Sequence, residues 1–505
     1  MATQEDKNLR LKRSKSLNQA DDFRKCEEIV RQLQPDKPCH KYQDSLFSWS
    51  SGFNDFNGFV NWAFVLLMMG GIRLLLENLL KYGIRIDPNV WLLLLFGGNG
   101  KEHNAALLLL TFVSYSYYMI RKLKFGFISD GIVPIFLSLF IEKAMAKRIF
   151  SENIGFAIQI INITYVIILP MILITTYSKR FGLLGATTVC MTYSIIFLKL
   201  WSYIQVNMWC RKQRNEKLLH KMKESVSFSN CLHKEKSSNN KGVNEVNLHL
   251  VIYPDNLNIQ DIVYFMFIPT LCYELNFPRT DRIRKRFIVK RILELIIGVH
   301  VLAALFQQWI IPSVKHSLIP FTNMDILKSI ERMLKLSIPN HLLWLVMFYL
   351  LFHSWLNFIG EIFHFADRNF YLDWWNATNS NVFWRKWNTV VHRWALRHVY
   401  LPMVDIGYSK FVASTAVFFI SAFFHEFLVS VPLGIFRSWA FVGMMLQIPL
   451  SSVSMYMEKH YGPRLGNVTV WLSLILGQPL CIMMYYHDYV ISHYGKALIE
   501  QFGHL

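Results

Sequence analysis

Two ionisable side chains, His425 and Glu426, lie inside one long apolar segment, "FVASTAVFFISAFFHEFLVSVPL" (residues 411–433). Placing such groups at bilayer depth is costly, so side chains found there generally serve a function. A histidine can take up a proton near neutral pH and return it, which is the chemistry of a general base. A histidine that only packs, through a hydrogen bond to a neighbouring span, is the structural alternative.

Glu426 directly follows His425, and adjacent residues of a helix point in different directions, about 100° apart. We therefore expect Glu426 to contact substrate or a neighbouring helix, not to orient His425 as the acid of a triad does. The chain contains no GxSxG, HExxH or P-loop motif. These features favour transfer between two bound substrates, with histidine as the base and without a covalent enzyme intermediate.

A second set of polar and aromatic side chains lies in residues 381–400, "NVFWRKWNTVVHRWALRHVY". Its apolar residues recur at steps of three and four, which predicts one amphipathic helix lying in a membrane surface. These residues are Trp384, Trp387, Val391 and Trp394. Asn388 and His392 lie one turn apart in such a helix and can face the same ligand. A helix that only anchors the protein is the alternative.

Composition places both segments in a membrane protein. Of the 505 residues, 53% are hydrophobic and only 17% are charged, against a typical charged share of about 25%. The apolar residues form blocks close to the ~20 residues that cross a bilayer. The net charge of +19 predicts an anionic partner, either lipid headgroups or a phosphorylated substrate. It does not favour nucleic acid, because the charges lie in loops between apolar blocks.

The apolar blocks predict an all-α polytopic membrane protein with about nine transmembrane helices. Eight segments are expected to cross the membrane: 59–79, 155–177, 181–205, 288–312, 340–363, 411–433, 436–457 and 467–490. Two further apolar runs lie at 104–120 and 129–142, and one of them is expected to be re-entrant or interfacial. A transporter is the alternative from another functional class, but the chain shows no internal repeat.

The distribution of Lys and Arg predicts the orientation of these spans. Residues 206–287 form a strongly basic loop, which the positive-inside rule places in the cytosol. Counting spans from there puts the loop 364–410 in the cytosol and the tail 491–505 in the lumen. Residues 1–50 are polar, without a cleavable signal pattern, and are expected to form a largely disordered cytosolic tail. Residues 51–490 then form the membrane domain. The seven cysteines lack metal-ligand spacing and are expected to be free thiols, with no metal site.

Three longer motifs in the chain resemble those of the membrane-bound O-acyltransferases. They are "FYLDWWN" (370–376), "PTLCYELNFPR" (269–279) and "FFHEFLVSVPL" (423–433). Within that superfamily they resemble the branch of sterol and diacylglycerol O-acyltransferases. "SGFNDFNGFVNW" and "WLSLILGQPL" are more similar to the diacylglycerol enzymes. The resemblance covers residues 42–490 and is poorest over 90–145.

The resemblance implies a helical bundle with a buried reaction chamber, in the membrane of the endoplasmic reticulum. It implies an enzyme that esterifies 1,2-diacylglycerol with fatty acyl-CoA, a co-substrate, to give triacylglycerol without any cofactor. A sterol O-acyltransferase that makes steryl esters is the alternative within the family. The resemblance also implies that membrane lipids surround a homodimer or homotetramer, which assembles through the N-terminal segment 1–58.

The resemblance further assigns roles to individual residues. His425 matches the catalytic histidine. The acyl-CoA site is expected to include Trp384, Arg385, Lys386, Trp387, Asn388, Thr389, Val390, Val391, His392 and Tyr400. Polar groups of the reaction chamber are expected at Glu426, Gln447 and Gln478. The first motif contributes Phe370, Tyr371, Asp373, Trp374, Trp375 and Asn376.

The CoA phosphates must dock on cations near the amphipathic helix. We expect Arg385, Lys386, Arg393 and Lys410 to supply this charge if the loop 364–410 is cytosolic. The chain departs from its family at Ser414, where relatives place a basic residue at the mouth of the tunnel. The phosphate contact there is therefore expected either to be lost or to move to Lys410.

Overall fold

The computed structural model describes residues 28, 31–32, 34–48, 51–52, 133–176, 182–215 and 250–494. All named elements in these residues are helices, and only two isolated β-bridges occur, Gln43 with Asp367 and Arg279 with Phe365. The expected all-α fold is therefore confirmed. The expected segments 59–79 and 104–120, with most of the tail 1–50, lie outside the described residues.

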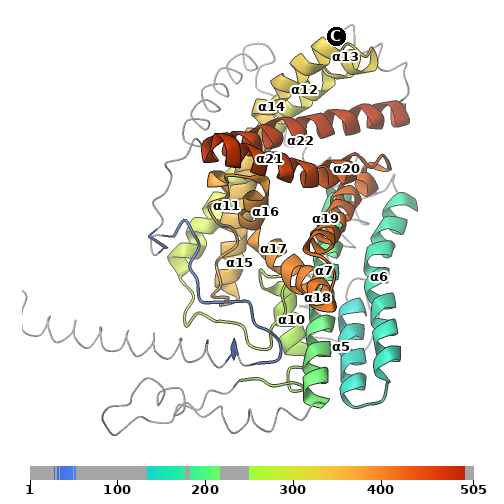
Figure 1. Ribbon diagram of the computed structural model, residues 1–505, viewed down its shortest axis with the longest axis vertical. Helices are drawn as coiled ribbons and strands as arrows, with labels where there is room; N and C mark the ends of the chain where they lie inside the picture. The colour runs from blue at the N-terminus through green and yellow to red at the C-terminus, as the bar shows by residue number, and fades with distance from the viewer. Residues whose placement is uncertain are drawn as a thin grey trace, which may run out of the picture.

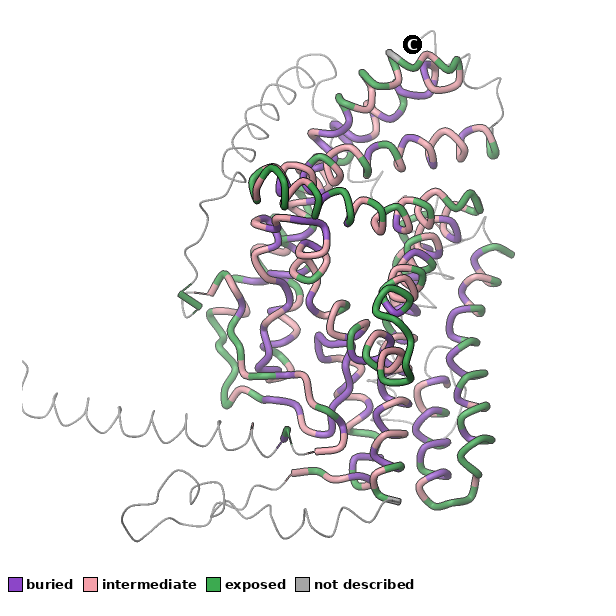
Figure 2. Tube along the Cα trace, viewed as in Figure 1, coloured by how far each residue is buried: buried purple, intermediate pink, exposed green. Residues whose placement is uncertain are grey.

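The first three helices stand together on one side of the molecule, α5 and α6 packing on each other and on α7 (Figure 1). They are α5 (Val133–Ala146), α6 (Glu152–Thr176) and α7 (Leu183–Asn215). α6 alternates buried and exposed residues along its length (Figure 2). Its sequence is mostly apolar on the exposed as well as on the buried side, as expected of a helix with protein on one side and lipid on the other. The buried Gln159 and Asn162 donate hydrogen bonds to α5.

The middle of the chain forms two long helices interrupted by π-helical turns. The first comprises α11 (Lys285–Leu305), η3 (Phe306–Ile310) and α12 (Ile311–Lys315). The second comprises α14 (Ile326–Phe348), η4 (Tyr349–Trp355) and α15 (Leu356–Ile362). The short helices α10 (Ile259–Phe267) and α13 (Leu318–Thr322) flank them.

A series of short helices then leads into three long ones. The short elements are η5 (Trp374–Asn376), α16 (Ser380–Trp387), α17 (Thr389–Ala395), η6 (Leu396–Tyr400) and α18 (Leu401–Ile406). The last part comprises α19 (Lys410–Leu433), α20 (Trp439–Met445), α21 (Gln447–Tyr461) and α22 (Pro463–Tyr494). α19 lies between α7 and α20, and α22 packs on α14 and α21 (Figure 1).

Six helices of the described residues are long and apolar enough to cross a membrane. They are Glu152–Thr176, Leu183–Arg214, Lys328–Ile362, Lys410–Leu433, Trp439–Tyr461 and Pro463–His493. Each contains or overlaps one expected span, so the polytopic architecture is confirmed. The expected span 288–312 falls within the continuous helix of α11, η3 and α12, and the run 129–142 overlaps α5. The total of nine stays a prediction.

The largest buried cluster is built from aromatic rings of the "FYLDWWN" motif and the helices around it. Phe370, Tyr371, Trp374 and Trp375 are all buried in it. Trp344 of α14 stacks on Trp387 of α16, with ring centroids 4.8 Å apart. Stacked and edge-on aromatic pairs contribute roughly 0.5–1.5 kcal/mol beyond area burial. The motif therefore joins the α16–α17 region to α14.

Residues 34–48, which the sequence assigned to a largely disordered tail, instead form an ordered segment that we call the strap. Asp36, His40 and Ser45 are buried. The strap adds a backbone bridge to the loop before the motif, where Arg368 donates its N–H to the Gln43 carbonyl at 2.7 Å. Sequence patterns do not predict that the strap is ordered, because it has no helical or strand periodicity. Its polar groups bind partners far along the chain.

Candidate active site

One face of α19 carries a stripe of side chains that do not pack into the core. Lys410, Ser414, Phe418, Ser421 and His425 recur at steps of three and four residues and are exposed or half-buried. On another face of α19, Phe427 and Val431 pack against α6 and α7. From Lys410 to His425 the stripe rises about 22 Å, at ~1.5 Å per residue. It thus leads from a cation at the helix start to a histidine within the span.

The hydrogen bond of His425 defines which ring nitrogen carries the proton. Its Nδ1 lies 2.8 Å from the Ser421 carbonyl oxygen, and a carbonyl can only accept. Nδ1 therefore donates, and Nε2 keeps its lone pair. No hydrogen bond joins Nε2 to any residue that the structure describes, and the side chain is exposed. The same local contact occurs at His300 and His460, so position, not this bond, distinguishes His425.

Three amide side chains of the expected site have their oxygen atoms turned toward a protein donor. Asn388 Oδ1 accepts the Val391 N–H at 3.1 Å, capping α17. Gln447 Oε1 accepts the indole N–H of Trp384 at 3.3 Å. A backbone N–H and an indole N–H can only donate, so these two orientations follow from the partners. The –NH2 groups of Asn388 and Gln447 are left as donors.

Gln478 is held in the same way by a residue that the sequence analysis missed. Asn340 of α14, itself buried, donates from Nδ2 to Gln478 Oε1 at 3.1 Å. Asn340 and His341 are two polar residues at the start of the expected span 340–363. Their position in an apolar block is the same signal that identified His425 and could have identified Asn340.

The α19 stripe and the amide residues are connected through Trp384. Its ring contacts Phe418 of α19 edge-on, at 6.3 Å between centroids, while its indole N–H binds Gln447 of α21. Phe418 and His425 are seven residues apart and therefore share a face of α19. The structure thus brings α16, α19 and α21 together on the side toward which His425 points.

The single amphipathic helix expected over residues 381–400 is wrong in its form. The segment is broken at Asn388, whose φ of −140° and ψ of 87° are not helical. The break follows from capping, because the Asn388 side chain satisfies an N–H at the start of α17. The three tryptophans of the apolar stripe pack against the protein core: Trp394 is buried, and Trp384 and Trp387 pack on the aromatic cluster.

His392 lies one turn beyond Asn388, as expected, and donates its backbone N–H to the Asn388 carbonyl at 3.0 Å. Burial lowers the pKa of His392, and the cations Arg385 and Arg393 lower it further. Its ring is therefore neutral at pH 7 and can act as donor or acceptor on different atoms.

Two of the four cations expected to dock CoA are already paired. Lys386 Nζ lies 2.9 Å from Asp373, and Arg393 lies 2.5 Å from Asp367. Arg385 and Lys410 are exposed and form no ion pair with any described residue. Of the four expected cations, Arg385 and Lys410 are therefore the two that remain available to a phosphorylated ligand.

The remaining expected site residues divide into scaffold and surface. Thr389 donates its hydroxyl to the Asn369 carbonyl, and Val390 packs between two core clusters. Val391 is 40% exposed, and Tyr400 is half-buried at the end of η6.

Among the residues of the "FYLDWWN" motif, the hydroxyl of Tyr371 lies 2.8 Å from His353 Nδ1. The Asn376 backbone N–H donates to the Asp373 carbonyl at 3.1 Å.

Glu426 points away from the stripe and binds the start of the next helix. Its carboxylate accepts the backbone N–H groups of Ser438 and Phe441, each at 3.0 Å. It also accepts the hydroxyls of Tyr485, at 2.8 Å, and Ser430. Of the two roles expected from the sequence, contact with a neighbouring helix is the one observed. A direct role in the reaction chamber is not supported by these contacts.

The strap holds the α17–η6 region from the other side. Asp367 Oδ2 accepts from Arg393 of α17 and lies 3.0 Å from His40 Nδ1. Arg397 of η6 donates to the Tyr273 carbonyl at 2.7 Å and to the Asp36 carbonyl. The strap and the loop 269–279 therefore fix the helix that carries Asn388 and His392.

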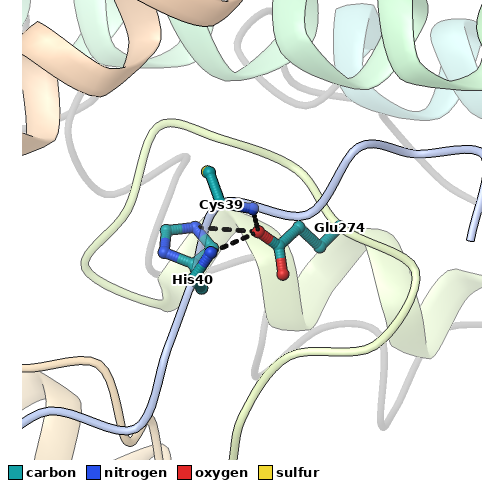
Figure 3. Close-up of side chains that lie close together, drawn as sticks. All are labelled: Cys39, His40 and Glu274. Atoms are coloured by element: carbon teal, nitrogen blue, oxygen red, sulfur yellow. Dashed lines mark hydrogen bonds and ion pairs between the residues drawn. The ribbon is translucent and has the colours of Figure 1, made fainter. Parts of the chain in front are cut away.

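Cys39, His40 and Glu274 offer three kinds of metal-binding atom within 4.8 Å of one another. Glu274 Oε1 instead accepts the backbone N–H groups of Cys39 and His40, at 2.5 and 2.7 Å, and Figure 3 shows the Cys39 side chain directed away from it. Arg31 binds the other carboxylate oxygen at 3.3 Å. We interpret the cluster as an anchor for the strap.

Comparison with known proteins places these features in one family. A model described as "MBOAT, membrane-bound O-acyltransferase family" matches residues 171–487. Diacylglycerol O-acyltransferase 1 of Homo sapiens is 42% identical over 463 residues, 92% of this chain and 86% of that protein. The Bos taurus protein of the same name is 41% identical over 90% of this chain and 86% of its own. The Corylus americana protein of that name is 33% identical over 92% of this chain and 78% of its own.

Proposed function

The chain belongs to the membrane-bound O-acyltransferase family, and from this premise we infer that it is a diacylglycerol O-acyltransferase. Its substrates are fatty acyl-CoA and 1,2-diacylglycerol, and its products are triacylglycerol and free CoA. The observation that carries this inference is the similarity to diacylglycerol enzymes over nine-tenths of the chain. The steryl-ester alternative has no comparable support.

We propose that His425 is the general base of the reaction. An aliphatic hydroxyl is a poor nucleophile until a base removes its proton during attack on the thioester. The contact with Ser421 leaves Nε2 of His425 as an acceptor on the open face of α19. The proton moves from the diacylglycerol hydroxyl to Nε2 as the ester bond forms. The carbon–sulfur bond then breaks, and the thiolate of CoA takes up the proton from His425.

The three oriented amides support a role in stabilising the tetrahedral intermediate. Attack places negative charge on the former carbonyl oxygen, and donors fixed before the reaction stabilise this charge most effectively. Asn388, Gln447 and Gln478 each keep an –NH2 group after their oxygen is bound by the protein. Asn340 acts as a positioning residue in this scheme, because it determines which end of the Gln478 amide remains available.

The α19 stripe supports a path for acyl-CoA. Arg385 and Lys410 would hold the phosphates, and the stripe from Lys410 to His425 would follow the arm that joins them to the thioester. Asn388, the N-cap of α17, and His392, one turn further, would stand beside this path. Ser414 lies one turn beyond Lys410 on the stripe, and Lys410 would replace the missing cation.

We further propose the location and assembly that the sequence suggests. The enzyme lies in the endoplasmic-reticulum membrane, with the N-terminus and the loop 364–410 cytosolic and the C-terminus lumenal. The basic segments on both sides of α10 support this orientation. Dimers or tetramers form through the N-terminal segment. A glycan on Asn376, in the sequence "NAT", would contradict the proposed orientation, because glycosylation takes place in the lumen.

An acceptor-competition assay tests the function. Membranes that contain the protein would be supplied with labelled oleoyl-CoA and with diacylglycerol, cholesterol or both. We expect label in triacylglycerol, unchanged when cholesterol is added. Label in steryl ester, or inhibition of triacylglycerol formation by cholesterol, would favour the sterol enzyme. His425→Gln in the same membranes serves as the inactive control.

A further inference from the structure

A groove on the outer surface between α11 and the α14–η4 helix does not belong to the site described above. It encloses about 550 Å³. Its apolar wall is formed mainly by Val289, Leu293, Ile297, Val301, Val346 and Leu350. Arg286 and Lys290, the two cations among the lining residues, stand on the first turns of α11. We propose that this groove binds a phospholipid with an anionic headgroup.

The lining residues of α11 fall on one helical face. Arg286, Lys290, Leu293, Ile297 and Val301 recur at steps of three and four residues. Leu293 and Ile297 are 54% and 62% exposed, so no described residue covers this face. This face of α11 rises about 22 Å from Arg286 to Val301, at ~1.5 Å per residue. One leaflet contributes about half of the ~30 Å hydrocarbon core. An acyl chain therefore fits beside the apolar part while the headgroup meets the cations.

The charge of the groove selects the class of headgroup. Glu294 also lines it, but its carboxylate is bound by Arg291 at 2.7 Å and by the Ser354 hydroxyl at 2.8 Å. Arg286 and Lys290 form no ion pair with any described residue, and both are exposed. Two adjacent cations at the end of an apolar groove suit a phosphate that carries net negative charge, because a zwitterionic headgroup brings its own cation.

The floor of the groove is closely packed, which favours a defined site over a surface that lipids only wet. A Cβ atom built on Gly298 would lie 2.2 Å from a methyl carbon of Leu350. α11 and the Leu350 side chain of η4 therefore approach closely there, and a larger residue at position 298 would require Leu350 to shift.

Native mass spectrometry of the full-length protein in detergent tests the proposal. The probes are dioleoyl phosphatidylglycerol, which is anionic, and dioleoyl phosphatidylcholine, which has the same chains and no net charge. We expect wild-type protein to prefer phosphatidylglycerol by about tenfold, and Arg286→Gln with Lys290→Gln to abolish that preference. Arg282→Gln with Lys285→Gln removes the same charge nearby without touching the groove and should keep it. Equal binding of both lipids to wild type, or equal loss in both double variants, would overturn the proposal.

A second pair of variants tests the apolar part with the cations in place. Ile297→Trp fills the groove and should remove the tightly bound lipid. Ile296→Trp adds the same bulk to an exposed neighbour that does not line the groove and should leave binding unchanged. A photo-crosslinking residue at position 297 identifies the occupant in membranes. A lipid adduct supports the proposal, whereas a peptide adduct, from this chain or a second copy, contradicts it.

Discussion

His425 and His40 show how the same side chain is used in two different ways in one molecule. His40 faces acceptors on both ring nitrogens: the Asp367 carboxylate at 3.0 Å from Nδ1 and the Cys272 carbonyl at 3.2 Å from Nε2. Burial opposes its charge, but Cys39, Glu274 and Asp367 together raise the pKa of His40 to about 9. It is a cation at neutral pH. His425 has one acceptor, at Nδ1, and an open Nε2.

The comparison teaches that hydrogen-bonding capacity that is both unfilled and accessible distinguishes the proposed reactive region from the strap region. In the strap region Arg31, Asp36, His40, Glu274, Asp367 and Arg397 all bind other protein groups. Around the α19 stripe, the histidine and the amides each keep one group without a protein partner among the described residues. Buried groups held by several protein partners rigidify a fold, whereas accessible groups left open can exchange a bond with substrate.

The largest effect should come from the open histidine. His425→Ala and His425→Gln should lower acyl transfer by about 10²–10⁴-fold, because general-base help is lost. Protein level and oligomeric state in membranes should stay as in wild type. Transfer would be measured as label from oleoyl-CoA in triacylglycerol. Activity of either variant above a tenth of wild type would exclude His425 as the base.

A smaller effect should follow when an amide donor is removed without disturbing its cap. Asn388→Asp keeps an oxygen that accepts the Val391 N–H but has no –NH2 group. Loss of one oxyanion donor typically costs about 10²–10³-fold in kcat. Asn388→Ala should lose both cap and donor and be less stable as well. If Asn388→Asp kept wild-type kcat with every acceptor, the amide would have only a structural role.

Asn340→Asp tests whether orientation alone matters. A carboxylate at position 340 cannot donate, so the Gln478 amide should turn its –NH2 toward Asp and its oxygen toward the substrate. We expect kcat to fall by up to about 10²-fold, with the KM for acyl-CoA unchanged. Asn340→Ser keeps a donor in a shorter side chain and should retain more activity. A change in the acyl-CoA KM alone would place Asn340 outside this role.

The strap should respond to pH through His40. The pKa of His40 is raised from 6.5 to about 9. Its contribution to stability is therefore complete below about pH 6.5 and is lost as pH rises through 9. The protection factors of residues 34–48, in which the pH dependence of intrinsic amide exchange is divided out, should fall above pH 9 in wild type, and His40→Gln should not show this fall. Protection factors that are independent of pH in wild type would show that the strap does not need the cation.

The smallest effect is expected at the two unpaired cations. Arg385→Gln with Lys410→Gln should raise the acyl-CoA KM several-fold at low salt, and the increase should shrink as salt is added. Lys386→Gln removes a cation that Asp373 already neutralises and should have less effect on KM. An increase that does not depend on salt, or one equal in all variants, would mean that these charges do not attract the CoA phosphates.

The sequence alone predicted the helices of the site better than it predicted which side chains pair with one another. Apolar length identified six of the spanning helices, and the isolated His425 needed only its position in one of them. The break at Asn388 was missed because the apolar periodicity of residues 381–400 continues through it. Pairing was missed at Arg393 and along the strap, since their partners lie 26 to several hundred residues away in the chain. Such contacts depend on tertiary packing, which local patterns do not encode.

The four hydrogen bonds of Glu426 also bear on how the enzyme is made. Tyr485, one of its partners, follows 59 residues later, so at ~5–20 residues per second translation takes about 3–12 s to supply it. During that time α19 carries a carboxylate in the membrane without its complete set of donors, which disfavours release into lipid. We expect nascent chains that end at Tyr461 to crosslink to the membrane insertion machinery through α19. Chains that continue through α22 should be released. The order of synthesis thus makes α22 the element that completes the insertion of the helix that carries His425.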